Sequence, residues 1–295
     1  MISLVLGVVS ILLVAVSVTF LLSPLETLET SQYSGGHERG RARGGADKDV
    51  QADVFVVFVS GIGSISGDAL LPAESRFLDR LSAGLPRARI VRDVFPYAPS
   101  GRPLLTGQRF FSWFWRVVGR DRDRGGPLLP AVLNIRNLYQ VLVSADRRYG
   151  PLYSHSIAEI TADRLQAAGY PFGSGVPLVL LGSSGGGQIS AGAAKYLGEI
   201  ANAPVSIVTF GGVMSADPGI AAAHKFYSYY GKSDAIYRLG RLAFPGRWPS
   251  SPTSTWNEAR SDGRLDEVNI GEISHSGSGG YLDPTEWHDG ESRLD

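Results

Sequence analysis

The sequence predicts an α/β fold: a mostly parallel β-sheet covered by helices on both faces, preceded by one transmembrane helix. Three observations predict this class. Short runs of Val, Ile, Leu and Phe alternate with helical patterns between residues 53 and 284, as is typical of strands buried on both faces. A Gly-rich turn directly follows one of these runs, at 182–187. Residues 2–22 carry no charged side chain.

The N-terminal run is long enough to cross a membrane. A helix of its 21 residues spans roughly 30 Å, about one bilayer core, and Pro24 would end it. A cleaved signal peptide would have Lys or Arg before a shorter apolar run. We therefore predict an uncleaved single-pass anchor at 1–23 that binds membrane lipid, with an atypical signal peptide or a buried helix as alternatives.

A hydrophilic segment at 24–52 follows the predicted anchor and is expected to be a flexible linker, because Gly, Ser, Arg and Asp dominate it. Its basic residues favour a cytoplasmic position for the domain that follows, since positive charge tends to stay inside. These residues are Arg39, Arg41, Arg43 and Lys48.

Composition excludes several classes of protein. A chain of 295 residues with 43% hydrophobic residues can bury a substantial core. The absence of Cys excludes disulfide scaffolds, thiolate metal sites and a Cys nucleophile. A formal net charge of zero gives nucleic-acid binding no electrostatic support. The five His residues are too scattered to predict a metal cluster.

The domain predicted at 53–284 has six expected strands, at 54–59, 89–95, 177–181, 205–210, 224–230 and 267–273. Helices are expected at 72–83, 131–149, 156–168 and 185–197, and Asp217 is expected to cap another helix. The helix at 131–149 should bury Ile135, Leu138, Leu142 and Ala145 and expose Arg136, Gln140, Ser144 and Arg147. An insertion or lid is predicted at 97–172, with an aromatic cluster at 110–115, and an acidic tail at 285–295.

The turn after the third predicted strand contains Gly-x-Ser-x-Gly, with Ser184 at its centre. A strand before and a helix after are the context in which this motif holds a nucleophile. The turn is sharp and strained, so side chains at Gly182 and Gly186 would collide with it. The backbone N–H of Gly185 and the helix N-terminus would then point toward a developing oxyanion.

A serine nucleophile needs a base and an acid that orients the base. Asp234 and His275 each follow a later predicted strand, and the carboxyl ends of parallel strands share one edge of the sheet. The predicted set is therefore Ser184, Asp234 and His275. Ser183 is an alternative nucleophile, Asp217 an alternative acid and His288 an alternative base, whereas His155 and His224 are expected to be structural.

These motifs together make residues 53–284 resemble the α/β-hydrolase superfamily. The resemblance rests on 182–186 (GSSGG), 231–234 (GKSD), 274–277 (SHSG) and 60–63 (SGIG). It implies that the N–H of Ile62 is the second oxyanion donor, beside that of Gly185, although Ser60 stands where the family often has His. It also implies a lipase- or esterase-like serine hydrolase that acts on a small ester or acyl substrate and needs no metal or organic cofactor.

Two other functions stay open at this point. A catalytically inactive hydrolase fold could serve as a binding module tethered to the membrane. A nucleotide-cofactor enzyme is the weaker alternative, because 182–188 lacks the Gly-Lys-Ser/Thr of a phosphate-binding loop. The sequence does not identify the substrate or the oligomeric state.

Overall fold

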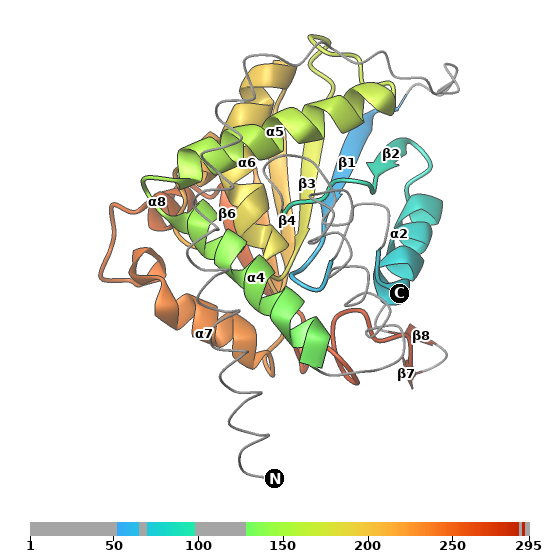
Figure 1. Cartoon of the computed structure of the whole chain (residues 1–295), viewed down its shortest axis with the longest axis vertical. Coiled ribbons are helices and arrows are strands. Elements are labelled where there is room, and N and C mark those ends of the chain that lie inside the picture. The colour runs from blue at the N-terminus through green and yellow to red at the C-terminus, as the bar shows by residue number, and fades with distance from the viewer. Residues whose placement is uncertain (1–51, 65–69, 98–127, 289–290, 293–295) are drawn as a thin grey trace.

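The computed structural model describes residues 52–64, 70–97, 128–288 and 291–292. Its centre is a six-stranded sheet in the order β2-β1-β3-β4-β5-β6, in which all neighbouring strands run parallel. Helices lie along the sheet in Figure 1. The predicted α/β class with a parallel sheet is therefore confirmed.

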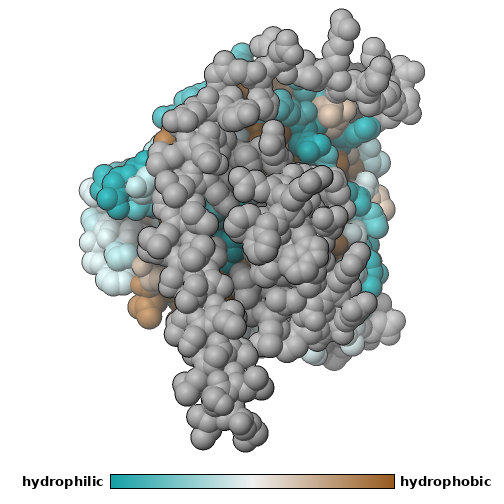
Figure 2. Space-filling model, in the orientation of Figure 1, coloured by the Kyte–Doolittle hydropathy of each residue, from teal (hydrophilic) through white to brown (hydrophobic). Residues whose placement is uncertain are grey.

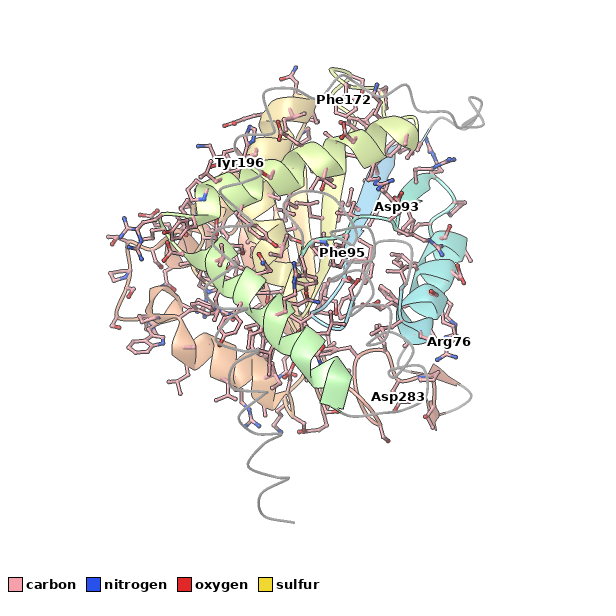
Figure 3. All side chains as sticks on the ribbon, in the orientation of Figure 1. Arg76, Asp93, Phe95, Phe172, Tyr196 and Asp283 are labelled. Carbon is pink, nitrogen blue, oxygen red and sulfur yellow. The ribbon has the colours of Figure 1, made fainter. Side chains whose placement is uncertain are left out.

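The strands are β1 Val54–Val59, β2 Ala88–Val91, β3 Leu178–Ser183, β4 Val205–Phe210, β5 Phe226–Tyr230 and β6 Leu265–Asn269. All six fall on predicted runs, but β2 and β6 each end four residues earlier than expected. In both cases apolar residues continue beyond the strand: Phe95 and Ile273 are buried without belonging to the sheet. Figure 3 labels Phe95 near the centre of the molecule.

One face of the sheet carries most of the helices. α4 Leu128–Ala145, α5 Gly150–Ala167, α6 Gly186–Ala201 and α8 Thr255–Ser261 lie on it. Alternate β1 residues, Phe55, Val57 and Val59, share a core with side chains of these helices. On the other face Val56 and Phe58 pack with Leu78 of α2, Pro72–Gly84. Coverage of both faces is thus unequal within the described residues.

The buried face of α4 differs from the prediction at five of the eight residues, whereas Ile135 and Ala145 are half-buried and Arg147, beyond the end of the helix, is exposed as predicted. Leu138 and Leu142 are 43% and 45% exposed, whereas Arg136, Gln140 and Ser144 are buried. The reason is that polar atoms on this helix bind backbone groups inside the molecule, as Arg136 does with the carbonyl oxygen of Tyr97 at 2.8 Å. The polarity of the side chains alone therefore predicted the wrong buried face for α4.

The chain between β5 and β6 holds more structure than the sequence indicated. It forms α7 Ala235–Ala243, η2 Pro245–Arg247 and α8. The predicted cap at Asp217 is confirmed: its side chain accepts a hydrogen bond from the Gly219 amide at the start of η1, Pro218–Ala222. Near the C-terminus, β7 Glu286–His288 and β8 Glu291–Ser292 pair as a short antiparallel hairpin within the predicted acidic tail.

Several predicted segments lie outside the described residues, namely the anchor at 1–23, nearly all of the linker at 24–52 and the aromatic cluster at 110–115. No helix in the described ranges has the length and apolar character needed to cross a bilayer. Of the predicted insertion, α4 and α5 are described, and both pack against α6.

The strand order creates a switch point between β1 and β3. From β1 the chain continues to β2 on one side, whereas β3 and all later strands lie on the other. The loops after β1 and β3 therefore leave neighbouring strands at the same edge, where parallel α/β sheets form their binding crevices. This geometry brings the Ser60–Ser64 loop next to Ser184.

Candidate active site

Ser184 occupies a strained position in the turn between β3 and α6. Its φ of 50° lies in the left-handed region, which costs a residue with a side chain about 1–2 kcal/mol. Three backbone hydrogen bonds hold it there: its N–H donates to Phe210 at 3.2 Å, and its carbonyl accepts from Gly187 and Val213, each at 3.0 Å. The Ser184 side chain is partly exposed.

Two glycines allow this turn to close, as the motif predicts. A Cβ added to Gly182 would lie 2.8 Å from the carbonyl oxygen of Gly186, and one added to Gly186 would overlap the carbonyl oxygen of Val59 in β1. These neighbours are backbone atoms, which cannot move aside without disturbing the sheet. The spacing of Gly182 and Gly186 around Ser184 thus has a direct steric cause.

Hydrogen bonds connect the three predicted side chains in a row. His275 Nε2 lies 2.8 Å from Ser184 Oγ, and His275 Nδ1 lies 2.8 Å from Asp234 Oδ2. Asp234 is fully buried and the His275 side chain is 19% exposed. The structure therefore brings together Ser184, His275 and Asp234 from three separate loops at one edge of the sheet. We call this row the Ser–His–Asp chain.

Asp234 is surrounded by hydrogen-bond donors. Its Oδ1 accepts from the Tyr237 amide at 2.8 Å, because Asp234 is also the N-cap of α7, and its Oδ2 accepts from the Tyr281 hydroxyl at 2.8 Å. Burial by itself would raise the pKa of Asp234, but the hydrogen bonds from His275, the Tyr237 amide and Tyr281 outweigh burial and lower the pKa below its ordinary value. Asp234 is thus held as a carboxylate.

The loop that carries His275 is closed on itself. Ser274 N donates to Gly279 O at 2.8 Å, and Gly279 N donates to the carboxylate of Asp283 at 2.6 Å. Figure 3 labels Asp283 at the lower edge of the molecule, the edge at which the loops leave the parallel strands. Because the loop is closed and Ile273 before it is buried, the imidazole approaches Ser184 from a fixed direction.

Gly185 directly follows Ser184, and the Ile62 side chain lies against Gly185; the backbone amides of these two residues are the oxyanion donors that the sequence predicts. Gly185 is the N-cap of α6, so the positive end of that helix lies next to Ser184. Within the described part of the chain neither amide donates to another group. A Cβ on Gly185 would lie 2.9 Å from methyl carbons of both Ile62 and Val141, so this region is tightly packed.

Buried side chains hold the Ser60–Ser64 loop by its carbonyl groups. The Tyr97 hydroxyl donates to Ser60 O at 2.8 Å, and Asn137 Nδ2 donates to Ile62 O at 2.6 Å and to Ser64 O at 2.8 Å. The Ile62 N–H lies in the same peptide plane as the Gly61 carbonyl, and that carbonyl accepts a hydrogen bond from Ser64 N at 3.1 Å. The hydrogen bonds from Tyr97 and Asn137 hold the peptide groups on either side of this plane. Burial raises the pKa of Tyr97 well above its ordinary value, so its hydroxyl remains a donor.

Sequence reasoning missed these supporting residues. Arg136 Nη1 lies 3.1 Å from Asn137 Oδ1 and so turns the amide nitrogen of Asn137 toward the loop. The available signal was Arg136, which we predicted on the exposed face of this helix, next to the amide side chain of Asn137, to which we assigned no role. Tyr97 carried no motif at all.

The alternative residues occupy other places. Asp217 caps η1, and its Oδ2 accepts from Gln188 Nε2 at 2.8 Å. Burial raises the pKa of Asp217, and its hydrogen bonds only partly oppose this. His155 lies on α5, 3.7 Å from Glu159. His224 precedes β5 and is exposed, and its backbone N–H donates to Val205 O at 2.8 Å. His288 belongs to β7, while the imidazole beside Ser184 is that of His275.

The arrangement has the elements of acyl-transfer chemistry. A hydroxyl contacts an imidazole and the imidazole contacts a buried carboxylate, which is the set of groups that can activate a serine for attack on a carbonyl carbon. Among the described residues, no cluster of three or more His, Asp or Glu side chains is placed to hold a metal ion. No family model matches the chain, and no curated protein matches it.

Proposed function

We propose that this protein is a serine hydrolase that cleaves carboxylic esters. The observation that supports the proposal most strongly is the Ser–His–Asp chain, with both heavy-atom distances at 2.8 Å, ending on a serine whose backbone is left-handed. Such strain persists only where the surrounding structure imposes it, and it concentrates at functional sites. The resemblance to the α/β-hydrolase superfamily agrees with this assignment.

In the proposed reaction, Ser184 Oγ attacks the ester carbonyl carbon while His275 Nε2 takes the hydroxyl proton. The carbonyl oxygen becomes an oxyanion, which accepts hydrogen bonds from the N–H groups of Gly185 and Ile62. The intermediate collapses, the C–O bond to the alcohol breaks, and His275 gives its proton to the departing alkoxide. Asp234 stays ionised and holds the imidazole in the correct tautomer and orientation.

A water molecule then attacks the acyl–serine ester and transfers one proton to His275. The second tetrahedral intermediate collapses, the proton returns to Ser184 Oγ, and the carboxylic acid leaves. No group other than the chain's own residues and water takes part. We also propose that residues 2–22 anchor the enzyme to a membrane, because their apolar length matches a bilayer core.

Labelling with a fluorophosphonate probe tests the proposed function. The probe is expected to label the full chain and Ser183→Ala, but not Ser184→Ala, because Ser184 is the serine whose hydroxyl lies 2.8 Å from the imidazole. Ser183 is a matched control, since it is the same residue type one position away at the end of β3. A folded chain that resists the probe, or a Ser184→Ala variant that still reacts, would contradict the proposal and favour a binding module.

A further inference from the structure

Helix α7 presents an apolar stripe to solvent. Ile236, Leu239 and Leu242 are 45%, 60% and 66% exposed, and their spacing of three residues places them along one side of the helix. We call these three residues the α7 stripe. Figure 2 shows hydrophobic surface at the lower left, where α7 lies in Figure 1. Isolated exposed leucines are common, but an aligned set on one helix indicates a contact surface.

The stripe is not needed to attach α7 to the rest of the domain. The helix is held by its opposite side, where Tyr237 and Gly240 are buried. A Cβ on Gly240 would lie 2.8 Å from a methyl carbon of Val213, so the backbone of α7 rests directly on the domain. The α7 stripe therefore contributes little to folding, and its three side chains are available to contact another apolar surface.

Basic and aromatic side chains accompany the stripe. Arg238 and Arg241 of α7 are exposed, and Trp248 is exposed with its indole N–H 3.2 Å from the carbonyl oxygen of Arg241. The neighbouring acid, Glu272, is paired with Lys232 at 2.7 Å. Apolar residues flanked by arginines and a tryptophan match the boundary between acyl chains and anionic headgroups.

We propose that α7 lies on a bilayer surface containing anionic lipid, with the α7 stripe among the acyl chains and Arg238 and Arg241 at the headgroups. A second copy of the chain fits less well. A symmetric contact would bring the two arginine pairs together, and like charges oppose it. A helix of nine residues is also only roughly 14 Å long, too short for the roughly 800 Å² per partner of a stable dimer.

Helix α7 begins at the candidate active site, so a lipid contact of the α7 stripe would also orient that site. The N-cap of α7 is Asp234, the acid of the Ser–His–Asp chain. Contact of α7 with a bilayer would therefore turn the edge of the sheet that carries Ser184 toward the lipid. This part of the inference rests on the proposed hydrolase function, and it names the substrate class as esters that reside in the membrane.

Site-specific labelling of the full chain tests the lipid contact. Because the natural chain has no Cys, Leu239→Cys takes a single polarity-sensitive NBD fluorophore. Ile200→Cys is the matched control: Ile200 is 39% exposed on an apolar position of α6, near the end of the helix remote from Ser184. Gly173 N donates to the adjacent Ala201 O at 3.2 Å, and Figure 3 labels Phe172 at that upper edge. Any anchor tethers both variants equally.

In vesicles of phosphatidylcholine and phosphatidylglycerol, we expect doxyl-labelled lipid to quench the fluorophore at position 239 several-fold more than the one at position 200. Adding Arg238→Gln and Arg241→Gln should reduce this quenching, because it removes the attraction to phosphatidylglycerol. Equal quenching at the two positions overturns the proposal. A signal at position 239 that fades as protein is diluted into more lipid also overturns it and assigns the surface to a second copy.

Turnover tests the substrate class separately. Leu239→Ser with Leu242→Ser is expected to lower hydrolysis of a vesicle-borne ester about tenfold, as loss of roughly 1.4 kcal/mol of apolar contact implies, and to leave hydrolysis of a water-soluble ester unchanged. If the double variant changes hydrolysis of the two esters by the same factor, the inference that the α7 stripe brings the site to membrane-borne esters is overturned. If the unaltered chain hydrolyses neither ester, the proposed hydrolase function fails, whereas the labelling result still decides the lipid contact.

Discussion

The hydroxyl of Tyr281 donates a hydrogen bond to Oδ2 of Asp234 at 2.8 Å. This is the same carboxylate oxygen that faces His275 Nδ1. The hydroxyl in turn accepts from the Gly231 amide at 2.8 Å, so its proton is directed at the carboxylate. The Tyr281 ring also lies edge-on to the imidazole, with centroids 6.2 Å apart. Tyr281 thus positions both the acid and the base of the Ser–His–Asp chain.

Tyr281→Phe is expected to lower kcat about 10- to 100-fold, since a hydrogen bond to a charged group contributes roughly 1.5–3 kcal/mol. KM should change little, because Tyr281 acts through Asp234 and not on the substrate. Tyr170→Phe is the control: its hydroxyl donates to Val176 O at 2.7 Å at a place unrelated to Ser184. Ester kinetics of both variants check this, and equal losses of kcat would contradict a positioning role for Tyr281.

Asp234→Asn is expected to reduce kcat by about four orders of magnitude, as loss of the orienting acid does in serine hydrolases. Three donors meet the two oxygens of Asp234, and an amide offers only one acceptor oxygen. Asp217→Asn changes an acid that binds Gly219 N and Gln188 Nε2 instead, so it should leave kcat near its original value and affect only thermal unfolding. Kinetics and thermal unfolding of the pair distinguish the two acids.

The two acids should also affect stability with opposite dependence on pH. The folded-state pKa of Asp234 is lowered from 3.8, so its contribution is complete above that value and is lost as pH falls below it. The pKa of Asp217 is raised from 3.8 by burial, so its carboxylate costs stability as pH rises through the raised value. Urea unfolding of the natural chain, Asp234→Asn and Asp217→Asn across the acid range measures both trends. Parallel curves would show that neither carboxylate has the stated shift.

Asn137→Leu is expected to reduce kcat about tenfold or more. Asn137 holds the loop that carries Ile62, the proposed oxyanion donor, and loss of such a donor costs up to several kcal/mol. The substitution keeps the branched shape of the side chain and removes both bonds to the Ser60–Ser64 loop. Asn257 provides a matched comparison, since its amide also holds a loop, through Trp248 O at 2.8 Å and Ser251 O at 2.9 Å. Asn257→Leu should destabilise the fold without lowering kcat. The role assigned to Asn137 fails if both variants keep full kcat.

Gly186→Ala is expected to destabilise the protein by about 3 kcal/mol or more, because its Cβ meets the Val59 carbonyl and overpacking against backbone cannot relax. Gly84→Ala, at the end of α2, has no atom within 4 Å of the added Cβ. Its free energy of unfolding should stay within about 1 kcal/mol of the original or rise, since Ala favours helix. Chemical denaturation compares the two. Similar values would mean that the turn around Ser184 adapts.

The strands were predictable because short runs of apolar, often β-branched residues are typical of strands that are buried on both faces of a sheet. Ser184, Asp234 and His275 could be found for a related reason: each follows such a run, and parallel strands end at one edge. The sequence therefore indicated the neighbourhood of these residues before any distances were available. The distances themselves depend on loops such as 274–283, whose course no local pattern describes.

The supporting residues were hidden by the rule that polar side chains face water. Arg136 and Asn137 break this rule because they satisfy carbonyl groups of distant segments, and such a partner is visible only after folding. Helix α7 departs from the companion rule that apolar side chains face the core, since Leu239 and Leu242 face outward and Gly240 faces inward. Periodicity cannot distinguish a stripe that meets the core from one that meets another apolar surface.

The pairing of β1 with β3 determines the stage of folding at which the candidate active site can form. Phe55 pairs with Leu178, 123 residues later in the chain (178 − 55). Closing so long a loop costs entropy before the contact repays it, so pairings of this kind slow folding. The Ser60–Ser64 loop and Ser184 meet only when β1 and β3 join, and His275 comes later still. We therefore expect hydrolytic activity to be among the last properties gained on refolding, after the helices have formed.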